Sequence, residues 1–418
     1  MIRHEEAIPA TGPEGFVPDR EHELLSSYRL DDASSPKLSV ALINYYGPSY
    51  GTGSGIILKR HFDRLKSAGH TVTVITPEYQ KYDAPLIDTA DAYFEIPNRR
   101  WFWPPFRQSI GVLYAIRVRL IARYVMANVS FDNVTHILST PMGMYSEVAR
   151  RVSKRLRIPL VIIHHDQEEI WSASPSSVAR SVHRTRLALI DARIVLSVTE
   201  ELPKTYGCAP EKIRLLRPIP GATVCRKIAA NPPSADVVYA GSIFQFHFDF
   251  LVRICAILSE FGAILYIICD NDNPIVKSLQ IEARNVKIVP LFKTNDEAIE
   301  FVSQKRASFL VLYSEKIEIQ PWSRTSFPSK FVDFCRSFVP ILIFSPEDTA
   351  IFKWCQDRAW PTFSSKYDEA SLRKILSAIA DPVQWNVLAA KTAELASGEF
   401  CPDVIQKELV DALYDAMN

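Results

Sequence analysis

The sequence predicts an α/β protein with two doubly wound domains that face each other across a cleft. Short apolar runs alternate with amphipathic stretches in both halves of the chain, which is typical of parallel sheets covered by helices on both faces. A proline-rich break at residues 217–221 and 231–234 separates the two sets. The length of 418 residues fits two or three domains of roughly 100–200 residues each.

The first half begins its regular pattern with a short apolar run at residues 37–44, which predicts a buried strand. A glycine-rich turn follows at residues 51–55, and an amphipathic stretch then predicts a helix over residues 56–68. Gly69 ends that helix and residues 71–76 predict the next strand, which completes one β-α-β unit. The same patterns predict three more strands and one more helix, at residues 135–139, 160–164 and 194–198 and at residues 145–157.

After the proline-rich break the pattern starts again, with a strand over residues 236–241 and a helix over residues 248–261. Further strands are predicted at residues 264–269, 286–290, 309–314 and 341–345, and the chain from residue 368 onwards is predicted to be helical. These elements divide the chain into five expected parts: a flexible tail over 1–36, a first domain over 37–217, a linker over 218–234, a second domain over 235–385, and C-terminal helices over 386–418.

Composition and charge exclude several classes of protein. Lysine and arginine number 48 and aspartate and glutamate 47, so the net charge of +1 is far from that of a dedicated nucleic-acid binder. No apolar run reaches the roughly 18–20 residues that cross a bilayer, and the N-terminus lacks the apolar centre of a signal peptide. The 7 cysteines are scattered and never spaced C-x-x-C, which argues against a disulfide framework or a zinc site. We expect a cytoplasmic protein, either free or at the inner face of the membrane.

Glycines cluster after the first predicted strand. Only 14 glycines occur in the chain, yet Gly47, Gly51, Gly53 and Gly55 lie close together. Glycines between a strand and a helix let the backbone approach a ligand and direct helix N–H groups at it. The spacing differs from the dinucleotide fingerprint, and the next strand ends at Thr76 without an acidic residue, so nicotinamide binding is not expected. The pattern predicts a loop over a substrate, and the alternative is a flexible turn without a ligand.

A histidine and several carboxylates follow the strand predicted at residues 160–164. His165 and Asp166 come first, and two glutamates follow within three residues. Ligands of open α/β sheets bind outside the carboxyl ends of the strands, where these groups can act as acids and bases or accept hydrogen bonds from sugar hydroxyls. We predict His165 and Asp166 as a functional pair. The alternative is a histidine that caps the strand beside solvated acids.

The segment from Thr325 to Asp333 contains a proline that suits the first turn of a helix. The hydroxyls of Ser326 and Ser329, the free N–H groups of the helix and the charge of Lys330 together predict a diphosphate site. Asp333 shares a helix face with Lys330, so the pair matches a nucleotide diphosphate and its ribose. The alternative is an ordinary capped helix that carries an ion pair.

Aromatic and basic residues are concentrated just before a predicted helix over residues 108–128. Arg99, Arg100, Trp101 and Trp103 combine interfacial aromatic rings with attraction to anionic lipid headgroups. On the helix, one apolar stripe is predicted, with Arg117 in its middle; its members are Ile110, Leu113, Tyr114, Val118, Ile121 and Val125. We predict an acceptor or membrane side here, with Arg117 meeting an acceptor phosphate, pairing with a carboxylate or reaching the interface. The alternative is a core helix under a tryptophan-rich loop.

Taken together, these segments resemble a GT-B glycosyltransferase, and most of all glycosyltransferase family 4, over roughly residues 37–400. Five motifs carry the resemblance in order: the glycine loop, residues 69–76 (GHTVTVIT), residues 158–166 (IPLVIIHHD), residues 238–241 (VYAG), and residues 327–334 (FPSKFVDF) followed by residues 339–343 (VPILI). Each motif alone is short, and their order makes the set specific.

The resemblance implies a GT-B fold of two Rossmann-like domains, with the final helix crossing back to the first domain. It implies a nucleotide-diphosphate sugar as co-substrate, a glycan or lipid-linked acceptor, and neither a metal ion nor another cofactor. Gly53, with Ser54 beside it, would lie against the donor phosphates and His165 beside the transferred sugar. Lys330 would hold the diphosphate, and Asp333 would take the family glutamate's role on the ribose.

Two positions depart from the family's pattern. Gly241 is followed by Ser-Ile-Phe-Gln-Phe-His-Phe, where many members carry an arginine and a lysine on the leaving diphosphate. Thr325 stands where the first acid of the E-x7-E pattern is expected. Stabilisation of the leaving group is then expected from Lys330, from the helix N-terminus and from Arg324 or His247.

The leading interpretation is a hexosyltransferase of polysaccharide biosynthesis that acts without a metal ion. A D-x-D triplet at residues 270–272 is typical of metal-dependent sugar transferases, but Asn273 and Pro274 follow it and predict a turn. One alternative is a non-catalytic GT-B protein that binds a partner in glycan assembly, which the missing cations favour. A second alternative is a nucleotide-sugar epimerase, which has the same architecture.

Overall fold

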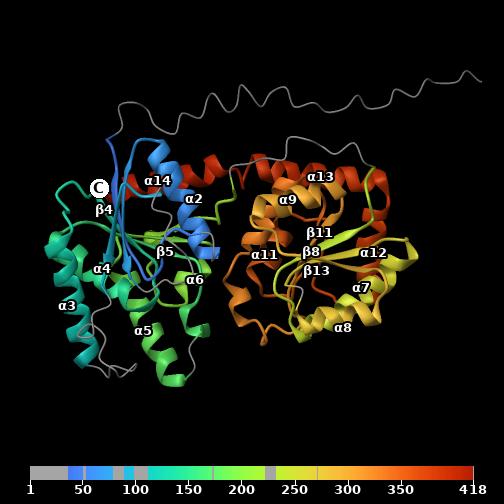
Figure 1. Cartoon of the computed structure of the whole chain (residues 1–418), viewed down its shortest axis with the longest axis horizontal. Helices are drawn as coiled ribbons and strands as arrows, with labels where there is room; N and C mark the ends of the chain where they lie inside the picture. Colours follow the sequence, from blue (N-terminus) through green and yellow to red (C-terminus); the bar gives the residue numbers. More distant parts are fainter. Residues whose placement is uncertain are drawn as a thin grey trace, which may run out of the picture. The chain divides into compact units, whose positions relative to one another are not determined.

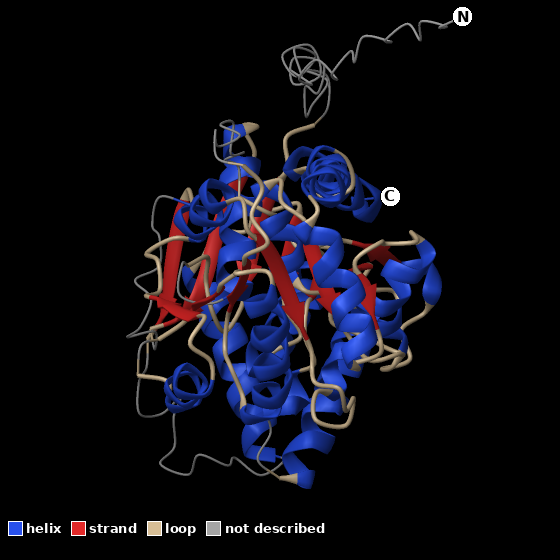
Figure 2. Cartoon of the chain, turned by 90° about the vertical axis from the view of Figure 1, so that its right-hand side faces the viewer, coloured by secondary structure: helices blue, strands red, loops and turns tan. Residues whose placement is uncertain are grey.

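The computed structural model describes residues 36–49, 53–78, 89–97, 112–171, 174–221, 232–270 and 272–417 (Figure 1). These residues form two parallel sheets with helices packed against them, so the predicted α/β fold is confirmed. Figure 2 shows the strands as a central layer between helices. Within the described ranges, no helix is long and apolar enough to cross a membrane.

The first sheet has seven strands in the order β3-β2-β1-β4-β5-β6-β7, and all neighbours are parallel. Its strands are β1 (Ser39–Ile43), β2 (Thr71–Pro77), β3 (Ala92–Ile96), β4 (His136–Ser139), β5 (Leu160–His164), β6 (Ile194–Ser197) and β7 (Ile213–Leu215). Its helices are α2 (Gly53–Ser67), α3 (Val112–Asn128), α4 (Gly143–Leu156), α5 (Pro175–Asp191) and α6 (Glu201–Lys204), with short 3-10 turns η2 (Glu168–Trp171) and η3 (Pro210–Lys212).

The two faces of the first sheet bury different cores because alternate side chains of a strand point to opposite faces. Val161 and Ile163 of β5 face α2 and a helix from the far end of the chain, α14 (Pro402–Met417). Leu160 and Ile162 of the same strand face the core that α3, α4 and α5 cover. The run from Leu160 to His164 is therefore apolar without interruption up to its histidine because both sides of it are buried.

The second sheet has six parallel strands in the order β10-β9-β8-β11-β12-β13. Its strands are β8 (Val237–Ala240), β9 (Leu265–Ile268), β10 (Val286–Val289), β11 (Ser308–Leu312), β12 (Ile341–Phe344) and β13 (Phe363–Ser364). Its helices are α7 (Phe248–Glu260), α8 (Pro274–Glu282), α9 (Asn295–Lys305), α10 (Ser329–Phe334), α11 (Ala350–Asp357), α12 (Glu369–Ala380) and α13 (Pro382–Ser397), with 3-10 turns η4 (Gln245–His247), η5 (Pro321–Arg324) and η6 (Cys335–Ser337).

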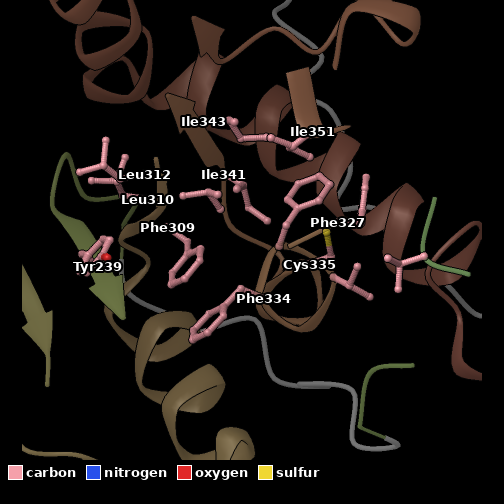
Figure 3. Close-up of a cluster of buried hydrophobic side chains, with 14 of the residues drawn as sticks. Tyr239, Phe309, Leu310, Leu312, Phe327, Phe334, Cys335, Ile341, Ile343 and Ile351 are labelled. Carbon is pink, nitrogen blue, oxygen red and sulfur yellow. The ribbon is translucent and has the colours of Figure 1, made fainter. Parts of the chain in front are cut away.

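Aromatic packing fixes α10 against the second sheet. The ring of Phe334 stacks on that of Phe309 of β11, with centroids 3.7 Å apart and planes at 6° (Figure 3). Phe327, just before the helix, lies in the same buried cluster (Figure 3). Because both ends of α10 are held by buried rings, the residues between them are presented at a fixed place on the sheet.

Both sheets reverse their strand order at one point, between β1 and β4 in the first and between β8 and β11 in the second. Strands on the two sides of such a switch point send their connections to opposite faces, which leaves a crevice at the carboxyl ends. The topology therefore identifies two edges where a ligand can bind.

Contacts between the halves of the chain come from several elements. Arg60 of α2 donates from Nη1 to Asp333 of α10 at 2.8 Å and to the carbonyl of Ile219 at 2.8 Å. The hydroxyl of Thr199 donates to the carbonyl of Thr325 at 2.6 Å. Helix α13 packs on β12. Helix α14 packs on β6 and contributes to the core that it shares with α2. The domain boundaries predicted above stay a prediction.

The start of α2 differs most from its prediction in its consequence for the site. The helix expected from residue 56 begins at Gly53, so Gly53 and Gly55 lie in its first turn and not in the turn before it. Glycine is unfavourable inside a helix but costs less in the first turn, where the N–H groups have no partner within the helix in any case. The periodicity of the apolar residues marks only the packed part of the helix and misses this turn.

Candidate functional site

Polar side chains gather at the carboxyl edge of the first sheet, at its switch point. Asn44 follows β1 and Thr140 follows β4; the Thr140 hydroxyl donates to Oδ1 of Asn44 at 2.7 Å. Nδ2 of Asn44 donates to the carbonyl of Tyr46 at 3.0 Å. Burial raises the pKa of the Tyr46 hydroxyl, while hydrogen bonds with Thr140 and Ser54 lower it. Ser54, which was predicted to bind the sugar donor, therefore lies beside Tyr46 at the start of α2.

His165 follows β5 at the same edge and is buried, with 8% of its surface exposed. Burial lowers its pKa to about 4, so the ring is neutral at pH 7. Within the described residues neither ring nitrogen has a hydrogen-bond partner. A neutral imidazole in this state has one donor and one acceptor available for a ligand.

Asp166 comes directly after His165 and is exposed. Its pKa is raised because protein atoms desolvate the carboxyl, while the nearby Ser326 side chain acts in the opposite direction. Burial raises the pKa of Tyr313, which follows β11, and the charge of Asp166 has a smaller effect in the same direction. The structure therefore brings Asp166 together with Ser326, a residue of the second predicted motif.

A cavity of about 220 Å³ lies at the carboxyl edge of the second sheet, again at the switch point. It is bordered by the ends of β8 and β11 and the start of α10; the lining residues are Tyr239, Ala240, Phe309, Leu310, Val311, Leu312, Tyr313, Pro328, Ser329 and Lys330. Tyr313 lies both on this cavity and close to Asp166. The cavity and the His165–Asp166 pair thus form one candidate site.

Lys330 is the one charged residue among those that line the cavity. Its Nζ donates to the carbonyl of Ala240 at 2.8 Å. The side chain reaches solvent, yet the protein atoms around the amino group lower its pKa to about 8. Gly241 has φ +139°, and a Cβ at this position would lie 1.9 Å from Nζ of Lys330. Glycine is favoured here by the backbone angle, and an added Cβ would also force the amino group of Lys330 to move.

The loop after Gly241 carries aromatic rings and one histidine. The rings of Phe244 and Phe246 stack with centroids 5.2 Å apart, and Phe244 is 46% exposed. His247 is buried and its pKa is lowered to about 4, so it carries no charge at pH 7. Burial disfavours the protonated ring, so His247 can act on a leaving group only as a neutral imidazole, and its role there stays a prediction. Arg324 is exposed at the end of η5.

Asp333 lies apart from the cavity lining. Its Oδ1 accepts from Arg60 at 2.8 Å and its Oδ2 from Nδ2 of Asn295 at 3.2 Å. Both carboxylate oxygens thus have protein partners, so the ribose role of Asp333 stays a prediction. Gly53 is exposed at the first position of α2, and nothing lies within 4 Å of where a Cβ would stand.

The predicted acceptor side is described only in part. Arg99, Arg100, Trp101 and Trp103 lie outside the described residues. Arg117 is half-buried on α3, and burial lowers its pKa while the hydroxyls of Tyr145 and Tyr114 act in the opposite direction. Val118, Ile121 and Val125 of the predicted stripe are buried, but Leu113 is exposed. The prediction wrongly included Leu113 in the buried stripe, because apolar residues occupy both sides of α3.

No group of three His, Cys, Asp or Glu side chains that could hold a metal ion occurs among the residues that the structure describes. At the D-x-D triplet, the N–H of Asp272 donates to Oδ1 of Asp270 at 3.1 Å and Asn273 caps α8, which is the geometry of a turn. Asn44, Tyr46, Thr140 and Tyr313 were not predicted. Each lies at or just after the end of a predicted strand, and a search of strand ends for polar residues could have found them.

Comparisons with known proteins agree with this geometry. Residues 52–218 match the family model described as Glycosyltransferase Family 4. The comparison with curated proteins found no match to this chain.

Solved structures of low sequence identity share the fold. The Anabaena protein HepE in complex with UDP and glucose is 12% identical, with a TM-score of 0.62 over 90% of this chain and 100% of that one. HepE with UDP-glucose gives a TM-score of 0.59 at 12% identity over 90% of this chain and 99% of that one. A glycosyltransferase from Rickettsia africae is 11% identical, with a TM-score of 0.64 over 92% of this chain and 100% of that one. The chain therefore has the GT-B fold of glycosyltransferases, and its residues 52–218 resemble Glycosyltransferase Family 4, as the sequence motifs predicted.

Proposed function

We propose that this protein is a glycosyltransferase that moves a hexose from a nucleoside-diphosphate sugar to an acceptor hydroxyl. One observation carries the proposal: Tyr313, which lines the cavity together with Lys330, lies within electrostatic range of Asp166 at the end of β5 in the other sheet. A donor whose diphosphate lies at Lys330 would present its sugar to the His165–Asp166 pair. The HepE structures contain UDP and UDP-glucose, so a uridine donor is the first to test.

The residues suit the charges that change during transfer. The bond between the anomeric carbon and the diphosphate oxygen breaks, and the new bond forms to the acceptor oxygen. Negative charge grows on the leaving diphosphate, where the Lys330 ammonium would stabilise it. Neutral His165 would hold a sugar hydroxyl, and the Asp166 carboxylate, whose pKa is raised, suits acceptance of the acceptor's proton. We propose that the enzyme acts without a metal ion.

The proposed acceptor is a glycan or a lipid-linked sugar of a polysaccharide pathway, reached from the cytoplasm or the inner face of the membrane. Ser326, Ser329 and Ser54 would add hydroxyls around the donor. The segment with Arg99 and Trp101 keeps its predicted role at the membrane side.

A single pair of assays tests the proposal. The purified protein is incubated with a panel of nucleotide sugars and EDTA, and release of free nucleotide is measured; UDP binding is measured by titration calorimetry. We expect His165→Ala to bind UDP normally and to lose at least about 100-fold in turnover, because its contacts form with the reacting sugar. His183→Ala, an exposed histidine of α5, is the matched control and should keep full activity. Wild-type turnover in His165→Ala would show that His165 only caps the strand and takes no part in transfer.

A second candidate function is nucleotide-sugar binding without transfer. The neutral His247 and the rings of Phe244 and Phe246 favour it, since they leave Lys330 as the only cation lining the cavity. UDP binding without nucleotide release from any donor would support this candidate. Release of free nucleotide without an acceptor, together with an epimerised sugar, would instead support an epimerase.

A further inference from the structure

The segment just before α10 is held by residues that follow strands of the first sheet. The hydroxyl of Thr199, after β6, donates to the carbonyl of Thr325 at 2.6 Å. The guanidinium of Arg217, after β7, lies over the ring of Phe327, with Cζ 4.0 Å from the ring centroid. Phe327 stands two residues before α10, and the first two residues of α10 line the cavity. The first sheet therefore contacts the chain directly before the cavity-lining part of α10.

Arg217 is fixed on its other sides by polar groups, and its side chain is only 12% exposed. Its Nη1 donates to the carbonyl of Val198 at 2.6 Å, and its Nε lies 3.7 Å from Oε1 of Glu399. Glu399 also accepts from Nε1 of Trp354 at 3.1 Å and from Nε of Arg358 at 2.9 Å. Arg217 follows the last strand of the first sheet and Glu399 precedes α14, so their contact joins the two places where the chain passes between the sheets.

Glu408 of α14 is a second carboxyl group near Arg217. Burial raises the pKa of Glu408 to about 7; the charge of Arg217 acts in the opposite direction, whereas the charges of Glu399 and Asp411 raise it further. Its Oε2 is buried and has no hydrogen-bond partner among the described residues. Arg217 thus lies between one glutamate that it already contacts and another that still has a free oxygen.

The other charged side chains of α14 are paired elsewhere: Asp403 with Arg64, Asp411 with Lys407, and Asp415 with Arg214. On α2, His61 contacts Gln406 at 2.8 Å and is neutral at pH 7, because burial lowers its pKa to about 3. Glu201 of α6 and Arg358 of α11 also act on the charge of Arg217. Among these groups, Glu408 is the one whose own charge changes near neutral pH.

We propose that Arg217 is a positioning residue for the cavity that Lys330 lines: it holds Phe327, and thereby the start of α10, and ionisation of Glu408 weakens this hold. The observed contact with Glu399, beside a Glu408 without a partner, is the arrangement expected for a neutral Glu408. An ionised Glu408 would compete with Glu399 for the guanidinium and draw it away from the ring of Phe327. The effect on donor binding rests on the proposed function, whereas the effect on α10 itself does not.

Amide hydrogen exchange of the full chain without any ligand tests the positioning step. We expect the α10 amides to exchange at least about fivefold faster in Arg217→Met, which keeps an unbranched apolar side chain but removes the cation. Arg217→Lys retains the charge and should lie between wild type and Arg217→Met. The matched control is Arg214→Met, an arginine of β7 that is 43% exposed and lies 3.6 Å from Asp415, and it should exchange like wild type. Equal exchange in both methionine variants would overturn the proposal.

Titration calorimetry with UDP tests the consequence for the cavity. We expect Arg217→Met to bind UDP at least about fivefold more weakly and Arg214→Met to bind it like wild type. Glu408→Gln should match wild type at pH 6, where Glu408 is mostly neutral, and bind at least about threefold more tightly at pH 8, where the wild-type carboxyl is ionised. Lys330 and UDP titrate in both proteins alike, so the ratio of the two affinities isolates Glu408.

The pH comparison carries the test if Arg217→Met fails to fold by circular dichroism. An affinity ratio that is the same at both pH values would overturn the role of Glu408. Normal UDP binding together with wild-type exchange and affinity in Arg217→Met would overturn this inference alone. If wild type binds no UDP while the exchange rates follow the expectation, the proposed function fails and the positioning of α10 by Arg217 is supported.

Discussion

At the scale of single residues, Lys330 combines two opposing effects. Its amino group is held by the carbonyl of Ala240 and lies beside Gly241, where protein atoms have replaced part of its water. A cation in such a place is costly for the empty protein but ready for an anion, because little hydration remains to be removed when a phosphate binds. Function and stability are therefore expected to change in opposite directions at this position.

We expect Lys330→Met to raise the melting temperature and to weaken UDP binding. The pKa of Lys330 falls from 10.5 to about 8, so the folded state disfavours the charged form. Below pH 8 that penalty is fully present, and it fades as the pH rises towards 10.5, where the lysine is neutral in both states. The gain in melting temperature should be present at pH 7 and much smaller at pH 10. Thermal unfolding at both values and UDP calorimetry measure it, and a lower melting temperature at pH 7 would contradict it.

Individual site residues could be predicted from the sequence when their position depends on local structure. Ser329 and Lys330 line the cavity, and their position could be predicted because the start of a helix is visible in the local sequence. Asp333 is different, because its partners Arg60 and Asn295 come from distant elements and no local pattern reveals them. The charge state of His247 could not be predicted from the sequence either, since its pKa depends on burial in the folded chain.

At the scale of elements, β8 and α10 meet at Gly241. We expect Gly241→Ala to weaken UDP binding at least about threefold and to destabilise the protein by about 1–3 kcal/mol, because a Cβ would displace Nζ of Lys330 and φ +139° is unfavourable for alanine. Gly262→Ala is the matched control. Its φ is +65° and nothing lies within 4 Å of the added atom, so it should lose about 1–2 kcal/mol and keep its UDP affinity. Urea unfolding and calorimetry separate the two. Equal UDP affinities in both variants would show that Gly241 has no part in UDP binding.

The elements themselves were largely predictable, and the errors have a common cause. Apolar runs in β1, β5, β8 and β11 identify buried parallel strands because both faces are covered. In α3 the same reasoning was ambiguous, since apolar residues occupy both sides of the helix and periodicity cannot tell which side is packed. The start of α2 was missed because Gly53 lies outside the packed part of the helix.

At the scale of the whole molecule, the ion pair of Arg60 and Asp333 connects the elements of the two sheets. The side chains are 15% and 9% exposed, and the carboxylate relies on this arginine for its charge partner. We expect Arg60→Ala to destabilise the protein by about 3 kcal/mol, since removing one partner leaves a buried charge unpaired. Urea unfolding measures the loss. The double variant Arg60→Met/Asp333→Leu should lose clearly less unfolding free energy than the sum of the two single variants. Strictly additive losses would show that the two side chains do not stabilise each other.

Asp333→Asn tests the ribose prediction in the same experiments. If the carboxylate serves only the ion pair, UDP affinity stays within about twofold of wild type while stability falls. If it also holds the ribose hydroxyls, UDP affinity falls by at least about tenfold, because bonds to a charged group contribute about 1.5–3 kcal/mol each. Calorimetry on this variant decides between the two roles.

The position of α14 has a consequence for how the chain folds as it is synthesised. The core between α2 and the first sheet is closed by Ile405, Leu409 and Leu413, which are made only after the entire second sheet. A growing chain that has finished β1 to β7 therefore still exposes the apolar face of α2 and β5 that α14 will cover. Domains usually fold in the order in which they leave the ribosome, but here the first must wait for the second. During that interval the uncovered face is a natural target for a chaperone.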